Sequence, residues 1–116
     1  MIWAIGRSAR LRATTRAAIE DQANEVVVSS ACVWEASIKI SNGKLSIPMD
    51  LADALEESGF ARLHITHEHA IAAGSLPRHH GDPFDRMLVA QAQLEGLTLV
   101  TADRGLAVYD VALLPA

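Results

Sequence analysis

The strongest constraint on the fold is one stretch, HHGDPFDRMLVAQAQLEGLTLVTADRG at residues 79–105, which carries start and stop signals for a helix and then a strand. Asp82 suits the N-cap position, because its carboxylate accepts hydrogen bonds from the free N–H groups of the first turn. Pro83 suits the first helical position, where a missing N–H costs no hydrogen bond. Gly96 then ends the helix as a left-handed cap. Between these signals runs an apolar stripe at helical spacing: Phe84, Met87, Leu88, Ala90 and Leu94.

The strand that follows this helix brings two carboxylates back together. About 12 helical residues at 1.5 Å each span roughly 18 Å. The strand predicted at residues 97–101 returns about the same distance, at roughly 3.3 Å for each residue. Asp103, after the strand, therefore returns beside Asp85, in the first turn of the helix. Open α/β sheets place their sites at this edge, outside the carboxyl ends of the strands.

Composition limits the class of protein. The chain has 116 residues, half of them hydrophobic, which predicts one globular domain with a core of its own. No apolar run is long enough to span a bilayer and no signal peptide is visible, so we expect a cytoplasmic protein that does not enter membranes. The single cysteine, Cys32, excludes an internal disulfide and is expected to be buried. The net charge of −4 argues against a protein that coats nucleic acid, but it does not exclude an enzyme that touches RNA locally.

Helices alternate with short apolar strands along the rest of the chain. The patterns predict helices at residues 8–23, 31–41, 50–58 and 67–73, strands at 26–28, 62–65 and 111–114, and a helical turn at 106–108. The strand at 111–114 is expected at an edge. This alternation predicts a three-layer α/β/α sandwich with a mostly parallel sheet, as a single domain over residues 1–116.

A third acid joins the predicted edge. Glu35 lies in the second turn of a helix that starts just after a strand, so we expect it near Asp85 and Asp103. Clustered carboxylates repel one another and are tolerated mainly when a cation lies among them. Oxygen ligands without a nearby cysteine favour Mg²⁺ or Mn²⁺. Such an ion activates a bound water and polarises a phosphodiester.

Each of these residues also has a plainer interpretation. Asp85 compensates the helix dipole in a first turn, and Asp103 is typical of turns. Glu35 suits a solvated helix position, although the neighbouring Trp34 predicts partial burial. The histidines lack the spacing of a zinc site, and of these only His80 is placed near the acids, as a weak candidate for contact with phosphate.

The sequence resembles the PIN-domain family, and within it the toxins of the VapC type. The likeness lies in the segments VSSACVWEASIKISNGKL and HHGDPFDRMLVAQAQLEGLTLVTADRGLAVYDVALL, and it extends over nearly all of the chain. It implies a PIN-like fold and an Mg²⁺-dependent endoribonuclease that cleaves RNA, with a cognate antitoxin that blocks the active edge and with homodimer formation. Matched by motif, Glu35, Asp85 and Asp103 are then the catalytic residues that hold the metal. Arg86 and Arg104 are candidates to contact the RNA backbone.

The sequence departs from this family at its start. The family opens with a central strand that ends in an aspartate, whereas MIWAI here matches the helix that follows that strand. Two explanations compete: either Met1 is an internal start of a longer chain, or the domain is N-terminally truncated. As written, we expect a sheet that lacks its central strand and a site that lacks one carboxylate. That leaves a second hypothesis, a catalytically impaired module that binds an antitoxin or RNA. A third, a phosphatase or receiver-like domain, is weaker, because those folds take their main aspartate from the first strand.

Overall fold

A computed structural model describes residues 2–3, 26–79, 81–101 and 103–115 of the chain. Within them, strands form one sheet in the order β3-β2-β1-β4-β5, and every neighbouring pair is parallel. The strands are β1 (Ile2–Trp3), β2 (Val27–Ser29), β3 (Ala61–Leu63), β4 (Leu99–Thr101) and β5 (Leu113–Pro115). The helices are α2 (Ser30–Ser41), α3 (Leu51–Ser58), α4 (His67–Ser75), α5 (Pro83–Glu95) and the 3₁₀ helix η1 (Arg104–Val108). The predicted α/β class with a parallel sheet is confirmed.

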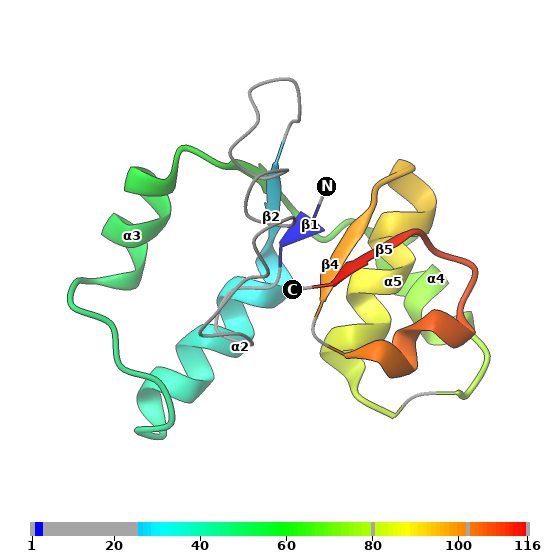
Figure 1. Ribbon diagram of the computed structural model, residues 1–116, viewed down its shortest axis with the longest axis horizontal. Helices are drawn as coiled ribbons and strands as arrows, with labels where there is room; N and C mark the ends of the chain where they lie inside the picture. Colours follow the sequence, from blue (N-terminus) through cyan, green and yellow to red (C-terminus); the bar gives the residue numbers. More distant parts are fainter. Residues whose placement is uncertain (1, 4–25, 80, 102, 116) are drawn as a thin grey trace.

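The helices gather in two groups in Figure 1. Helices α4 and α5 lie side by side on the right, beside β4 and β5. Helices α2 and α3 lie on the left, and α2 leaves directly from the end of β2. Helix α2 also packs against α5, so the two groups meet beneath the carboxyl ends of the strands. The described part of the chain contains no helix that is long and apolar enough to cross a membrane.

Local signals fix both ends of α5 as predicted. The side chain of Asp82 accepts hydrogen bonds from the N–H groups of Phe84, at 2.8 Å, and Asp85, at 3.3 Å. Pro83 occupies the first helical position. Gly96 adopts the left-handed conformation, with φ at 65°, which a residue with a Cβ adopts at a cost. The helix is thus capped by its own sequence at each end.

We expect Asp82→Ala to lower the free energy of unfolding by about 1 kcal/mol, the usual cost of losing an N-cap. Asp50→Ala removes the same kind of cap from α3, whose side chains are all at least partly exposed. The loss from Asp50→Ala should be smaller, because fraying of α3 exposes less buried surface. Chemical denaturation of both variants measures the difference. Equal losses would contradict the view that α5 anchors the core.

The expectation of a missing central strand is wrong for the sheet itself. Ile2 pairs in parallel with Val27 of β2 and with Leu99 of β4, so β1 occupies the central position. A gap between β2 and β4 would leave two buried strand edges unpaired, and a short apolar segment rich in β-formers satisfies them. The position of β1 does not change the prediction that the first acid of the site is absent, since no Asp or Glu occurs between Met1 and Ile19. The predicted helix at residues 8–23 lies outside the described residues.

Other boundaries differ from the predicted ones by one or two residues. The strand predicted at 62–65 is β3 at Ala61–Leu63, and the strand predicted at 111–114 is β5 at Leu113–Pro115, at the edge of the sheet as expected. The helix predicted at 67–73 is α4 at His67–Ser75, which continues through Gly74.

The core lies where β2, β4, α2 and α5 meet. Its buried members include Val28, Cys32, Leu88, Val89, Leu99 and Leu106. Cys32 is buried and free, as predicted. This packed layer holds the starts of α2 and α5 against the sheet, and it therefore positions the side chains on those turns.

Candidate functional site

Asp85 lies in the first turn of α5 and is almost completely buried, with 1% of its surface exposed. The Asp82 cap and the proline fix the start of the helix, so Asp85 takes the third helical position. A carboxylate at a helix N-terminus is stabilised by the partial positive charge of the helix dipole. Burying a charge is costly without compensation, however, and helix dipole compensation alone does not require burial. The burial of Asp85 therefore favours a role beyond that of a dipole partner.

Glu35 is also buried, with 8% of its surface exposed, so the interpretation as a solvated helix residue is wrong. It lies in the second turn of α2, one residue after Trp34. The rings of Trp34 and Phe84 meet edge to face, with their centroids 5.2 Å apart. Phe84 precedes Asp85, so this aromatic pair packs the turn that carries Glu35 against the turn that carries Asp85.

Asp103 follows β4 and caps the 3₁₀ helix η1. Its carboxylate accepts a hydrogen bond from the N–H of Gly105 at 2.8 Å, and its own N–H donates to the Thr101 hydroxyl at 3.0 Å. The turn interpretation of Asp103 is therefore correct, and it is compatible with a second role. The side chain is only half-buried, so it remains accessible from solvent.

The parallel sheet brings these three acids to one edge. Helix α2 begins directly after β2, and η1 follows directly after β4, so Glu35 and Asp103 lie beyond the carboxyl ends of their strands. Helix α5 runs back along β4, which returns its N-terminus and Asp85 to the same edge (Figure 1). Within the described ranges, however, no three Asp, Glu, His or Cys side chains form a group that could hold a metal ion. The three-acid metal site therefore stays a prediction.

The acids at this edge suit a hard divalent cation. Mg²⁺ binds oxygen ligands and commonly uses only one or two protein carboxylates, with water completing its shell. Two buried carboxylates on packed turns, Glu35 and Asp85, supply oxygen donors of this kind. The donor chemistry fits Mg²⁺ or Mn²⁺ better than zinc, which favours nitrogen and sulfur.

Of the three residues predicted to contact phosphate, the structure describes the side-chain contacts of Arg86. The guanidinium of Arg86 donates hydrogen bonds to the carbonyl oxygens of Ala73 and Leu76, at 3.0 Å each, and of Pro77, at 3.1 Å. These contacts favour a structural role in the connection between α4 and α5. His80 and the side chain of Arg104 lie outside the described part of the structure.

Sequence reasoning missed a buried polar chain between the helices. The Ser29 hydroxyl donates to the Gln91 side chain, which contacts His69, and His69 contacts Glu95. The signal was present in the sequence, because Gln91 interrupts the apolar stripe of α5 three residues after Leu88. A polar residue at a core position of a helix usually has a buried hydrogen-bond partner.

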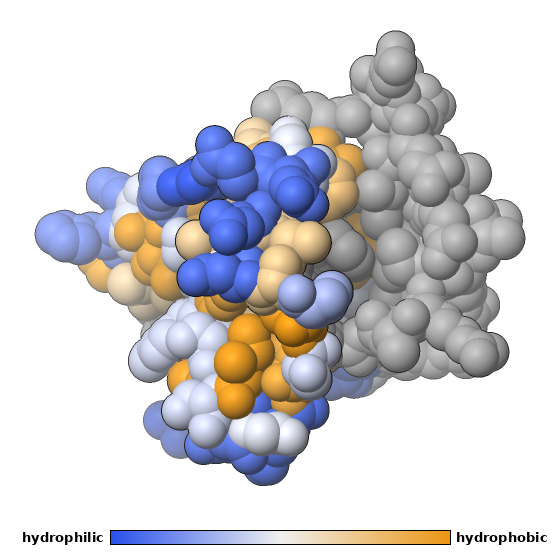
Figure 2. Space-filling model, turned by 90° about the vertical axis from the view of Figure 1, so that its left-hand side faces the viewer, coloured by the Kyte–Doolittle hydropathy of each residue, from blue (hydrophilic) through white to orange (hydrophobic). Residues whose placement is uncertain are grey.

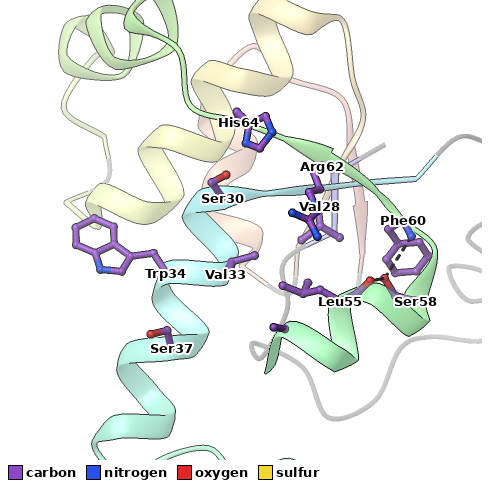
Figure 3. A pocket seen from close by; sticks show the side chains of 11 residues that line it. Val28, Ser30, Val33, Trp34, Ser37, Leu55, Ser58, Phe60, Arg62 and His64 are labelled. Atoms are coloured by element: carbon purple, nitrogen blue, oxygen red, sulfur yellow. Dashed lines mark hydrogen bonds between the residues drawn. The ribbon is translucent and has the colours of Figure 1, made fainter. Parts of the chain in front are cut away.

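A groove of about 390 Å³ opens beside the same helix α2, between β2, β3 and α3 (Figure 3). Its wall is mainly apolar, and Ser30, Arg62 and His64 supply polar groups near one end. Trp34 at its margin is 62% exposed, which is unusual for so large an apolar side chain. Figure 2 shows the face on the α3 side, where apolar surface lies between strongly hydrophilic side chains. Exposed apolar surface of this kind often marks an interaction site.

Comparison with known proteins agrees with this architecture. The family model of the PIN domain matches residues 1–112. A solved structure described as FitAB bound to an IR36 DNA fragment superposes with a TM-score of 0.65 at 16% identity, covering 99% of this chain and 94% of that one. No curated protein matches this sequence. PIN domains are generally nucleases and generally use divalent metals. Since the family model spans nearly the whole chain, the protein belongs to the PIN-domain family.

Proposed function

We propose that this PIN domain is a metal-dependent endoribonuclease, and that it acts as the toxin of a toxin–antitoxin pair. The observation that carries the proposal is the pair of buried carboxylates, Glu35 and Asp85, on turns held together by the Trp34–Phe84 contact. Clustered carboxylates repel one another, and a cation among them makes their burial more favourable. A divalent cation held by both side chains is therefore consistent with their burial.

Each acid has a separate task in this proposal. Glu35 and Asp85 hold the cation, and Asp103, half-buried at the same edge, contributes the third carboxylate and faces the solvent from which water and substrate arrive. Bound Mg²⁺ or Mn²⁺ supplies Lewis acidity and a water of lowered pKa for in-line hydrolysis of an RNA phosphodiester. Burial of the two ligands excludes competing water, which would strengthen their attraction to the cation. Arg104 and His80 remain proposed contacts to the RNA backbone, whereas the guanidinium of Arg86 is engaged by backbone carbonyls and is assigned a structural role.

The surface beside this site suits the binding of a protein partner. The apolar groove along α2 and the exposed Trp34 offer a binding surface next to Glu35, and a cognate antitoxin bound there would cover the active edge. The solved relative is itself described as FitAB in complex with DNA, which supports a PIN domain acting within a larger assembly. A homodimer is part of the same proposal.

The decisive test is cleavage of RNA by purified protein with and without Mg²⁺, together with the Asp103→Asn variant. We expect cleavage that requires the metal, disappears with a chelator, and falls on the order of 100-fold in the variant, since a charged ligand contributes several kcal/mol to such a reaction. Asn retains an oxygen that can accept from Gly105, so the fold should be kept. Asp110→Asn, an exposed acid after η1, is the control. Unaltered cleavage by Asp103→Asn would refute the assignment.

The second candidate is an impaired PIN domain that binds an antitoxin or RNA without cleaving it. One observation favours it, since no three metal-ligating side chains form a group in the described residues. Calorimetry separates the two functions. No heat of Mg²⁺ binding, with tight binding of the neighbouring gene product or of RNA, would establish the binding module.

A further inference from the structure

One hydrogen bond that the proposed function does not use joins two fully buried polar side chains. The hydroxyl of Ser29 donates a hydrogen bond to Oε1 of Gln91 at 2.5 Å, and neither residue has exposed surface. Ser29 is the last residue of β2, and Gln91 lies in the middle of α5. The contact therefore crosses the seam where the start of α2 packs against α5.

Both ends of this hydrogen bond are fixed by further contacts. The oxygen of Ser29 also accepts from the N–H of Ala31 at 3.0 Å and so caps α2. On the other side, Nε2 of Gln91 contacts the carbonyl of His64 at 3.5 Å and Nδ1 of His69 at 3.4 Å. Gln91 therefore directs its oxygen toward Ser29 and its amide nitrogen away from it.

His69 defines the orientation of this chain of contacts. Its Nδ1 accepts the N–H of Thr66 at 3.0 Å, which means that Nδ1 carries no proton. The proton of the neutral ring is then on Nε2, which donates to Glu95 at 2.9 Å. Nδ1 can accept from the Gln91 amide and cannot donate to it, so the Gln91 side chain has only one orientation that satisfies its neighbours.

Each carboxylate of the candidate site is separated from this contact by the same number of residues along its own helix. Glu35 follows Ser29 by six residues, and Asp85 precedes Gln91 by six residues. At 1.5 Å for each residue, both acids are about 9 Å along rigid helices from the Ser29–Gln91 bond. The Trp34–Phe84 contact joins the same helices near the acids. Two contacts at separate points fix both the distance and the rotation between the turns.

We propose that Ser29 and Gln91 are positioning residues, which set the separation of Glu35 and Asp85 and thereby the affinity of the site for its metal. This inference rests on the proposed metal-dependent function. Stability alone does not explain the pair, because apolar side chains of similar shape in a core are often as stabilising as a buried hydrogen bond. A buried hydrogen bond does, however, permit only one register between two helices, which an apolar contact does not.

The test compares Gln91→Met with Gln93→Met on the same helix. Methionine keeps the approximate volume of glutamine and removes its hydrogen bonds. Gln93 is exposed and donates to the carbonyl of Asp110, at 3.0 Å, so it is a matched control away from the seam. Calorimetric titration of RNA-free protein with Mn²⁺ gives the affinity. We expect Gln91→Met to weaken Mn²⁺ binding about 10-fold, the usual scale for residues that orient metal ligands. Gln93→Met should bind as wild type does.

A second pair of variants guards against a simple folding defect. Ser29→Ala should weaken Mn²⁺ binding to a similar extent. Ser29→Thr keeps the hydroxyl and the cap, and it should bind Mn²⁺ with the wild-type affinity. Wild-type Mn²⁺ affinity in both Gln91→Met and Ser29→Ala would overturn the positioning role, even if both variants melted at lower temperature. If the wild-type protein binds no Mn²⁺ and cleaves no RNA, the proposed function itself fails, which is a different result.

Discussion

Asp85→Asn is expected to reduce RNA cleavage on the order of 100-fold, because it removes a charged oxygen ligand worth several kcal/mol to metal-assisted hydrolysis. The free energy of unfolding should stay the same or rise. Asparagine has nearly the same shape, and removing a charge from a side chain that is 1% exposed relieves part of its desolvation cost. Cleavage rates with saturating Mg²⁺ and chemical denaturation measure the two effects separately.

This variant separates the two interpretations of Asp85. If the residue only compensates the helix dipole, its replacement should cost about 0.3–1 kcal/mol of stability and leave cleavage unchanged. Asp53→Asn is a matched control, since Asp53 also occupies the third position of a helix capped by an aspartate, in α3. Asp53 is exposed and is not one of the acids of the candidate site, so only the dipole contribution should be lost there. A stability loss in both variants with full cleavage would contradict the metal role.

Local signals explain why α5 was predictable. The cap at Asp82, the proline after it and the glycine at its end each act within a few residues, and the structure bears out all three. The same reasoning placed Asp85 and Asp103 at one edge, because a short turn at Gly96 forces β4 to run back along its helix. Prediction succeeded where covalent neighbours determine the geometry.

The predictions were wrong or incomplete where residues far apart in the sequence determine the local structure. Nothing in Ile2 and Trp3 alone specifies a central strand, because two residues form a strand only where two neighbours offer unpaired backbone groups. The Ser29–Gln91 contact joins residues 62 positions apart, and its partners become evident only when α5 is placed on the sheet. The burial of Glu35 also depends on the packing of α2 against α5, which helical periodicity does not specify.

The largest loss of stability is expected at Arg86, because its guanidinium holds together the connection between α4 and α5. It donates to the carbonyls of Ala73, Leu76 and Pro77, and a longer contact of 3.5 Å reaches the Tyr109 hydroxyl. Arg86→Met keeps the apolar stem and removes every donor. We expect a loss of about 2–4 kcal/mol, since hydrogen bonds to charged groups contribute more than neutral ones and several are lost together. Arg78→Met, an exposed arginine in the same connection, should change stability by less than about 0.5 kcal/mol.

RNA binding by the two arginine variants tests whether Arg86 also touches the substrate. Affinity is best measured in the Asp103→Asn background, where the substrate should be cleaved much more slowly. Because the guanidinium of Arg86 is already committed to backbone carbonyls, Arg86→Met should weaken RNA binding no more than Arg78→Met at temperatures where both are folded. Arg86→Lys should recover only part of the stability, since an ammonium cannot reproduce the planar fork that reaches these carbonyls. Weaker RNA binding by Arg86→Met with unchanged stability would instead assign Arg86 to the substrate.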